Sequence, residues 1–262
     1  MLNYVVLGDP VAHSLSPRLH TAALAAVGIE GAYTARRVDA AGFMTAVDEI
    51  RSGALAGANV TMPHKQLAAR AADELSDNAR RAGSVNTLVL RTGVLRGETT
   101  DVGGIRDAWG DLPGGPVLIL GAGGAAAAAV LALEGRPLSV AARRREAAQR
   151  LVARTRVDAQ VIEWGRPCAG CVVVNATPIG MGDEQLPAEV LEAASGLFDM
   201  PYGTGETASV TLARRLGIPV VAGAEMLLHQ AARSFECWTG VQAPLAAMRA
   251  ALSSDHSARS NT

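Results

Sequence analysis

One stretch of the chain constrains the possible folds more than any other. It joins an apolar run, PVLIL at residues 116–120, to the glycine turn GAGGAA at residues 121–126 and then to an alanine-rich helical segment. Gly121 permits the tight turn, Gly123 lets the backbone approach a pyrophosphate, and the small Ala126 lets helix and strand pack closely. A glycine-rich turn with a purely structural role is the alternative, but the strand–turn–helix context favours a phosphate site. The predicted dinucleotide contacts are Gly121, Ala122, Gly123, Gly124 and Ala125.

The segments after this turn continue the alternation of short strands and helices. Further apolar runs lie at residues 137–142, 160–164, 171–177, 196–200 and 218–223. Together with residues 116–120 they supply the six parallel strands that a doubly wound sheet with crossovers needs. The segments 224–240 and 243–252 are predicted to be helical, and the polar end of the chain is predicted to fray.

The chain before the glycine turn is also of α/β type. Predicted strands lie at residues 4–8, 34–39, 57–62 and 84–90, and helix-like segments lie at residues 16–28, 41–53 and 65–75. The alternation of apolar strands and helix-like segments is interrupted at GETTDVGGI, residues 97–105. We therefore predict an α/β fold of two domains. They are an N-terminal α/β substrate domain of residues 1–102 plus 223–262, and a Rossmann-type domain with a doubly wound parallel sheet of residues 103–222.

Composition excludes several classes of protein. A net charge of −1, from 24 basic and 25 acidic residues, and an aromatic content of 3% provide no surface for nucleic acid. No apolar run is long enough to span a bilayer, so no membrane partner is expected. The start MLNYVVLGDP lacks the basic region of a signal peptide and predicts a first strand. Because three cysteines make no framework for a secreted protein, we expect a reducing, cytoplasmic setting.

Two of the cysteines, Cys168 and Cys171, form a lone CxxC pair. A zinc site would need a second pair, which the sequence lacks, so no metal is expected. A redox pair would usually begin a helix, whereas the following CVVVNATP is typical of a strand. We expect two small apolar residues at the entrance of that strand.

The residues after the strand at 137–142 indicate which dinucleotide binds. A site for NAD usually has Asp or Glu at this strand tip, where it binds the ribose hydroxyls. Here Ala142 is followed by Arg143, Arg144 and Arg145, and guanidinium groups bind a 2′-phosphate in a bidentate manner. The alternative is a solvated basic helix start, but cations at a helix N-terminus oppose the helix dipole. The pattern favours NADP, bound through Arg143 and Arg144.

A second informative stretch is NVTMPHK at residues 59–65, where a strand ends and a helix begins. Asn59 and Thr61 are two apart on the predicted strand, so their side chains face the same side. Lys65 could simply open the solvated face of the following helix. It could also be an acid/base amine beside a substrate that Asn59 and Thr61 hold.

Four other segments place polar residues at the ends of strands, where α/β proteins hold ligands. They are GDPVAHSLSP, GSVNTL, GETTD and GAEMLLHQ. With HSLSP, NVTMPHK, GSVNTL, GAGGAA, NATPIGM and MLLHQA in this order, the chain resembles the shikimate dehydrogenase family from about residue 7 to residue 240. The resemblance implies NADP-dependent, reversible reduction of a small molecule, 3-dehydroshikimate, to shikimate in aromatic amino-acid biosynthesis. We expect a monomer or a homodimer.

The resemblance also implies a role for each matching residue. Ser14 and Ser16 would bind the substrate carboxylate, although both could instead cap the helix that begins near Pro17. The substrate hydroxyls would be bound by Asn59, Thr61, Asn86, Asp101 and Gln230. The remaining implied sites are Tyr202 near the active cleft, Thr177 along the cofactor groove, Gly223 at the carboxamide and Met226 against the nicotinamide. Ordinary core filling is the alternative for Met226.

In the family that the chain resembles, the lysine that Lys65 matches is catalytic, and Asp101 matches a partner at the reacting centre. Reducing a ketone by hydride transfer leaves an alkoxide, and a positioned amine can supply the proton that it needs. His13 and His64 are rivals for this task, since histidine titrates near neutrality. The family pattern assigns the task to Lys65, and we expect His64 to be a structural residue with its hydrogen bonds satisfied.

Several positions depart from the usual family pattern: Thr99, Ala142, Arg144, Gly203-Thr204 after Tyr202, and Glu225. They leave open a paralogue that acts on quinate/shikimate or on aminoshikimate. Ser16 and the arginines argue against a quinate enzyme, because resembling enzymes of that kind often have threonine at the second serine and often use NAD. A non-catalytic NADP-binding sensor is the alternative from another class, and it would need neither Lys65 nor Asp101.

Overall fold

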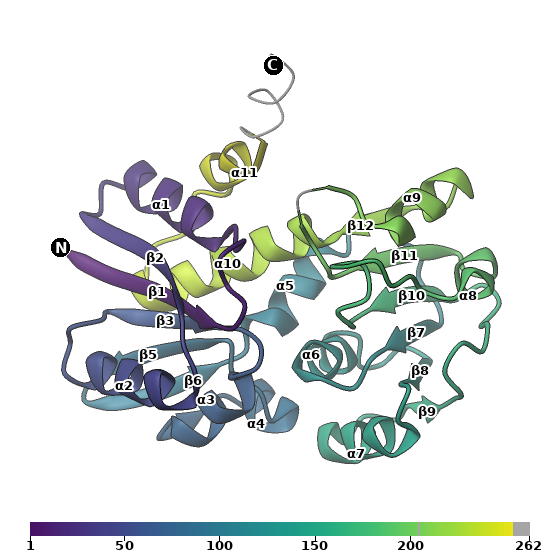
Figure 1. Cartoon of the computed structure of the whole chain (residues 1–262), viewed down its shortest axis with the longest axis horizontal. Helices are drawn as coiled ribbons and strands as arrows, with labels where there is room; N and C mark the ends of the chain where they lie inside the picture. The colour runs from purple at the N-terminus through teal and green to yellow at the C-terminus, as the bar shows by residue number, and fades with distance from the viewer. Residues whose placement is uncertain (204, 254–262) are drawn as a thin grey trace. The chain divides into compact units, whose positions relative to one another are not determined.

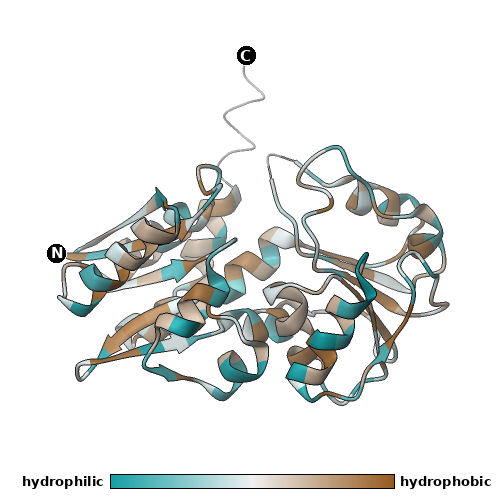
Figure 2. Ribbon diagram, turned by 60° about the horizontal axis from the view of Figure 1, so that its bottom comes forward, coloured by the Kyte–Doolittle hydropathy of each residue, from teal (hydrophilic) through white to brown (hydrophobic). Residues whose placement is uncertain are grey.

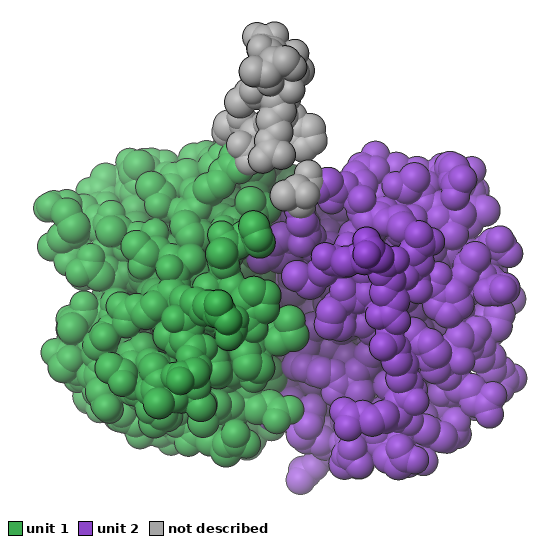
Figure 3. Space-filling view, in the orientation of Figure 1, with its two compact units in different colours: residues 1–80, 84–100, 227–262 green, residues 81–83, 101–226 purple. Residues whose placement is uncertain are grey.

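The computed structural model describes residues 1–203 and 205–253, so Thr204 and the polar end at residues 254–262 lie outside the described residues. The chain divides into two compact units, which Figure 3 colours separately. The first unit consists of Met1–Arg80, Ser84–Thr100 and Leu227–Thr262, and the second of Arg81–Gly83 and Asp101–Met226. The predicted domain limits differ from these bounds by a few residues, and the assignment of substrate to one unit and cofactor to the other stays a prediction.

A mixed six-stranded sheet runs through the first unit in the order β2-β1-β3-β5-β6-β4 (Figure 1). Its strands are β1 (Leu2–Gly8), β2 (Gly31–Arg37), β3 (Gly57–Val60), β4 (Glu74–Leu75), β5 (Thr87–Arg91) and β6 (Val94–Glu98). β1 pairs in parallel with β2 and β3, whereas β5 runs antiparallel to both β3 and β6. Every residue of β3 is buried, so the strand that carries Asn59 is covered on both faces.

The helices that lie wholly or mostly in the first unit are α1 (Ser16–Ala26), α2 (Ala40–Arg51), α3 (Lys65–Ala71), α4 (Asp77–Ala82), α10 (Gly223–Thr239) and α11 (Leu245–Ser253). Asp39 begins α2 by accepting a hydrogen bond from the Gly42 N–H at 2.8 Å, as an N-cap aspartate does. The apolar face of α2 buries Phe43 and Ile50 in a core that also contains Val5 of β1.

The helix predicted for residues 65–75 is wrong at its C-terminal end, because α3 stops at Ala71. Asp73 instead accepts two hydrogen bonds of 2.7 Å from Arg51 and one of 2.9 Å from the Leu95 N–H. These donors lower the pKa of Asp73 to about 2. The chain is thereby drawn to the edge of the sheet, where β4 pairs with β6.

The prediction contains no strand at residues 94–98, where the structure has β6, so the hairpin that β5 and β6 form is not expected. Its two-residue loop is Thr92-Gly93, with φ of 49° and 81°. Positive φ at both positions is the type I′ geometry, which asparagine or aspartate before glycine usually signals. Because threonine occupies the first position, the sequence does not signal this turn.

The second unit contains a six-stranded parallel sheet, which confirms the predicted doubly wound architecture. Its strands are β7 (Val117–Leu120), β8 (Leu138–Ala141), β9 (Gln160–Val161), β10 (Val172–Asn175), β11 (Gly196–Asp199) and β12 (Val220–Ala222). Their order, β12-β11-β10-β7-β8-β9, is the order of a dinucleotide-binding domain, in which the strand order reverses between the first and the fourth strand. The topological switch point therefore lies between β7 and β10.

Helices cover both faces of this sheet (Figure 1), and hydrophobic residues, drawn in brown, are frequent along its strands (Figure 2). The helices are α5 (Thr100–Ala108), α6 (Gly124–Ala132), α7 (Arg145–Thr155), α8 (Ala188–Glu192) and α9 (Ala208–Arg215). Along β7, Ile119 packs in one core with the alanines of α6, while Leu118 packs in another with Leu191 of α8 and Val210 of α9. In the part of the chain that the structure describes, no helix is long and apolar enough to cross a membrane.

Candidate active site

The glycine turn lies at the switch point of the second unit, directly after β7. Gly121 has a φ of +122°, and a Cβ there would lie 2.8 Å from the carbonyl oxygen of Ala176, which follows β10. Glycine is therefore required at this position. Gly123 occupies the N-cap of α6, and a Cβ on it would meet nothing within 4 Å. An open turn at a helix N-terminus beside two strand ends fits a pyrophosphate. The other predicted contacts, Ala122, Gly124 and Ala125, are half-buried around it.

A buried carboxylate holds the loop that follows β10. Asp199 of β11 accepts hydrogen bonds from Asn175 Nδ2 at 2.7 Å and from the Thr207 hydroxyl. Burial raises the pKa of Asp199, while these two hydrogen bonds act in the opposite direction. Asn175 Oδ1 accepts from the Thr177 hydroxyl at 2.6 Å and from the Thr177 N–H at 3.1 Å. Thr177, the predicted groove residue, thus belongs to a hydrogen-bonded turn, and its methyl group faces Gly121.

The basic run after β8 has an acidic partner that sequence reasoning missed. Arg143 forms an ion pair with Glu184, from the loop between β10 and α8. The Arg143 guanidinium also lies 5.8 Å from the centre of the Trp164 ring. The ion pair raises the pKa of Arg143 and lowers that of Glu184. Arg144 is exposed at the N-cap position of α7.

In the first unit, Asn86 lies at the centre of a buried hydrogen-bond network. Its Nδ2 donates to Gln230 Oε1 at 3.2 Å and to the Thr100 hydroxyl at 2.9 Å. Its Oδ1 accepts from the Thr100 N–H at 2.8 Å, where α5 begins. The structure therefore brings two predicted site residues together, Asn86 before β5 and Gln230 on α10.

Asn59 belongs to the same network and uses its polar atoms inside it. Its Oδ1 accepts from the Tyr33 hydroxyl at 2.7 Å, and its Nδ2 donates to Thr87 Oγ1 at 3.1 Å and to Ser234 Oγ at 3.0 Å. These contacts give Asn59 a positioning role, and its contact with substrate stays a prediction. Ser234 lies one turn after Gln230 on α10, and that spacing was the signal from which it could have been found.

The two serines of HSLSP lie at the start of α1. Ser16 is the first residue of the helix and is buried, and its N–H donates to the Ser14 hydroxyl oxygen at 3.3 Å. Ser14 therefore contributes to the helix start, as the capping alternative predicts, although the N-cap position itself belongs to Leu15. The binding of a carboxylate by these hydroxyls stays a prediction.

The motif NVTMPHK lies where β3 ends and α3 begins. Thr61 follows β3, and its methyl group occupies the space that a Cβ on Gly8 would need, so Gly8 leaves room for Thr61. Lys65 is the half-buried first residue of α3. His64 is buried, with its Nε2 2.8 Å from the carbonyl oxygen of Val38. As expected, His64 is a structural residue whose hydrogen bond is satisfied.

Asp101 and Tyr202 belong to the second unit. Asp101 is 3% exposed in the first turn of α5, and Tyr202 is half-buried in the loop after β11. Lys65 belongs to the first unit, and its pairing with Asp101 at a reacting oxygen stays a prediction.

Gly223 and Met226 begin α10 and also belong to the second unit. A Cβ on Gly223 would clash with the carbonyl oxygens of Met200 and Pro201, so packing alone requires glycine there. Met226 is 9% exposed and lies in the main hydrophobic core of the unit, in keeping with the core-filling alternative. Contacts of both residues with a nicotinamide stay predictions.

Cys168 and Cys171 lie at the entrance of β10, as expected, but they form a disulfide, so the prediction of two simple apolar residues is wrong. Across residues 1–203 and 205–253, no group of three or more His, Cys, Asp and Glu side chains could hold a metal ion.

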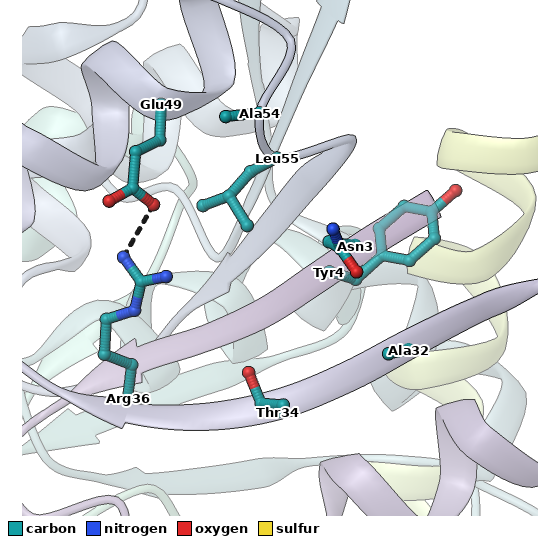
Figure 4. Close-up of a pocket in the computed structure, with 8 residues that line it drawn as sticks. All are labelled: Asn3, Tyr4, Ala32, Thr34, Arg36, Glu49, Ala54 and Leu55. Carbon is teal, nitrogen blue, oxygen red and sulfur yellow. Dashed lines mark hydrogen bonds and ion pairs between the residues drawn. The ribbon is translucent and has the colours of Figure 1, made fainter. Parts of the chain in front are cut away.

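A cavity of ≈ 230 Å³ lies on the first unit beside β1 and β2 (Figure 4). It is lined by Asn3, Tyr4, Ala32, Thr34, Arg36, Glu49, Ala54 and Leu55. Arg36 and Glu49 point toward each other and pair at 2.7 Å. None of the predicted site residues is among these eight, so this cavity is separate from the candidate active site.

Comparison with known proteins gives matches along most of the chain. A family model described as the shikimate dehydrogenase substrate binding domain matches residues 6–88, and one described as the shikimate 5′-dehydrogenase C-terminal domain matches residues 223–252. A protein of Acidiphilium cryptum named shikimate dehydrogenase (NADP(+)) is 40% identical over 248 residues, which cover 90% of each chain. The chain belongs to the shikimate dehydrogenase family.

Solved structures of the family agree with this fold. The shikimate 5-dehydrogenase of Thermus thermophilus, in complex with NADP(H) and shikimate, has a TM-score of 0.88 and 35% sequence identity, and the match covers 96% of this chain and 98% of that chain. The shikimate dehydrogenase of Mycobacterium tuberculosis has a TM-score of 0.85 and 35% identity, covering 97% and 100%. The resemblance that the motifs predicted is therefore confirmed for the family and for the fold.

Proposed function

We propose that this chain is an NADP-dependent oxidoreductase that interconverts 3-dehydroshikimate and shikimate in the biosynthesis of aromatic amino acids. One observation carries the proposal. The open glycine turn of Gly121 and Gly123 lies at the switch point of a parallel sheet, in a family whose relatives are named for NADP(+) and shikimate. Dinucleotides bind at this point in doubly wound sheets.

The side chains of the second unit fit a dinucleotide that carries a 2′-phosphate. The N-terminus of α6 offers backbone N–H groups to a pyrophosphate, and Gly121 and Gly123 leave it accessible. Arg143 and Arg144 follow β8, at the place where the adenosine ribose lies in such folds, and offer cations for the 2′-phosphate. When bound, NADPH supplies the hydride for the carbonyl carbon of the substrate.

In the first unit the polar side chains suit an acid that bears several hydroxyls. Ser14 and Ser16 donate to the carboxylate, and Thr61, Asn86 and Gln230 bind ring hydroxyls. Asn59 acts one step away, because its Nδ2 donates to the Asn86 carbonyl oxygen at 3.1 Å and so holds the segment that carries Asn86. A site that pairs hydroxyls in this way rejects analogues that lack them, since its own buried polar groups are left unpaired.

Lys65 is the proton donor of the proposed reaction. Hydride addition to the carbonyl carbon leaves negative charge on the carbonyl oxygen, and the Lys65 ammonium transfers one proton to it, which yields the alcohol. In the reverse direction the neutral amine removes the hydroxyl proton. Asp101 binds the hydroxyl beside the reacting centre and orients the substrate.

Turnover with a panel of substrates and cofactors tests this function. We expect purified protein to oxidise NADPH with 3-dehydroshikimate and to reduce NADP with shikimate, with clearly higher kcat/KM for shikimate than for quinate or aminoshikimate. Failure with all three acids and both cofactors would refute the proposed activity. Equal efficiency with quinate would move the chain to the quinate/shikimate branch. We also place the protein in the cytoplasm and expect a monomer or a homodimer, which fractionation and light scattering test.

A further inference from the structure

In the proposed cofactor site, the Arg143–Glu184 ion pair would lie beside the 2′ position of the adenosine ribose, which carries a phosphate in NADP and a hydroxyl in NAD. Arg143 comes from the turn after β8, and Glu184 comes from the loop after β10, 41 residues later. The side chains are 57% and 59% exposed, so a ligand can reach both. Trp164 adds a second contact to the guanidinium, within the range of a cation–π interaction.

The two members of this pair favour different cofactors. A 2′-phosphate carries about −1.5 to −2 charges at neutral pH, so it must displace Glu184 from Arg143 or bind beside a carboxylate that repels it. A ribose 2′-hydroxyl, by contrast, donates a hydrogen bond to a carboxylate, as it does to the acid at the strand tip of NAD sites. The tip of β8, at Ala142, lacks the acidic residue of NAD sites, and Glu184, which belongs to the loop after β10, supplies a carboxylate near the same position.

We propose that Glu184 is a specificity-determining residue that lowers the preference of this site for NADP over NAD. The proposal rests on the proposed function, because it requires the adenosine ribose to lie beside Arg143. Arg144 is exposed next to Arg143, so the subsite keeps a cation for the 2′-phosphate while Glu184 occupies the first one. The 2′-phosphate and the Glu184 carboxylate therefore compete for the Arg143 guanidinium.

Binding of two nucleotide fragments to the full chain tests this role without any turnover. The probes are adenosine 2′,5′-bisphosphate and adenosine 5′-monophosphate, measured by calorimetry for the unmodified protein, Glu184→Gln and Asp183→Asn. Asp183 is the exposed neighbour of Glu184 in the same loop, so its variant removes an equal charge without removing the partner of Arg143. Because exposed ion pairs contribute little, we expect Glu184→Gln to tighten bisphosphate binding by about two- to fivefold and to leave monophosphate binding unchanged or slightly weaker.

The double variant Arg143→Ala/Glu184→Gln identifies the route of the effect. If Glu184 acts by occupying Arg143, the double variant binds bisphosphate no more tightly than Arg143→Ala alone. Equal gains for Glu184→Gln and Asp183→Asn would overturn the proposal while leaving NADP use intact, whereas a gain that persists without Arg143 would support it through direct repulsion of the phosphate by Glu184. If the unmodified chain and Glu184→Gln bound both fragments equally, the 2′-phosphate would not be recognised, and the proposed use of NADP would fail as well.

Discussion

The Asn86 side-chain amide donates a hydrogen bond of 3.2 Å to Gln230 Oε1, although the two residues are 144 positions apart in the chain. Asn86 lies directly before β5, and Gln230 lies in the middle of α10. The bond ties two predicted substrate contacts into one buried network with Thr100 and Ser234. A substitution in this network can therefore change stability, substrate binding or both.

Asn86→Ala should lower both stability and substrate affinity. It leaves the buried Thr100 N–H without its acceptor and removes one partner of the Thr100 hydroxyl, which keeps Ser234, and this should lower the free energy of unfolding by about 1–3 kcal/mol. It should also raise KM for shikimate. Ser234→Ala is the matched control, since Ser234 is fully buried in the same network and should lower stability with KM nearly unchanged. Denaturant unfolding and steady-state kinetics measure the two effects, and a normal KM for Asn86→Ala would remove Asn86 from the substrate site.

Lys65→Ala should lower kcat by about 10²- to 10⁴-fold, the range for loss of a general acid/base. Gln66→Ala, at the exposed next position of α3, should keep near-normal turnover. Stopped-flow and steady-state rates across neutral and alkaline pH make the comparison. If Lys65→Ala turned over normally across that range, the proton donor would have to be another group, such as His13.

Arg143→Ala/Arg144→Ala should raise KM for NADP strongly and change KM for NAD little. Each charge-assisted contact with the 2′-phosphate contributes roughly 1.5–3 kcal/mol of binding free energy. Because Glu184 competes for Arg143, we expect the contribution of Arg143 to lie near the lower end of this range. Arg150→Ala, an exposed arginine further along α7, controls for general loss of positive charge. Equal weakening of both cofactors would make the two arginines structural.

His20 should make the protein less stable in mild acid. It is fully buried, stacks on the ring of Tyr33 and packs at a tilted angle against the ring of Trp238. Burial lowers its pKa to about 3, and the neighbouring Asn59 side chain acts in the opposite direction. Neither ring nitrogen has a hydrogen-bond partner among the described residues. The stabilising effect of the neutral ring is present above the unfolded pKa of about 6.5 and is lost as pH falls toward 3, at about 1.4 kcal/mol per pH unit.

The variant His20→Phe keeps an aromatic ring in the stack and removes the titrating group. The slope of unfolding free energy against pH between about 6 and 4 should therefore be smaller in His20→Phe than in the unmodified protein. His13→Gln, at an exposed position, should keep the original slope. Identical slopes for all three proteins would show that His20 does not take up a proton on unfolding in this range.

The sequence by itself determined the architecture of the second unit. Its apolar runs, its glycine turn and its alanine-rich helix are patterns of a few consecutive residues, and each acts through local geometry. Gly121 illustrates this, because the φ of +122° that its turn requires is a property of one residue. The first unit differs from the prediction where local patterns do not apply. Thr92-Gly93 forms a tight turn without the residues that usually signal one, and α3 ends early because Asp73 binds Arg51, which is distant in the sequence.

Only the tertiary structure decided which polar side chains meet and which are already engaged. Asn59 and Thr61 look alike as alternate residues of one strand, yet Asn59 has all its polar atoms bound by Tyr33, Thr87 and Ser234 inside the first unit. In the second unit, parallel strands separated by long crossovers end at the same edge of the sheet, which sets Glu184 beside Arg143. Ion pairs and hydrogen bonds form between groups that are close in space. In a fold with crossover connections, residues that are far apart in the sequence can be close in space, so the sequence pattern alone does not identify these partners.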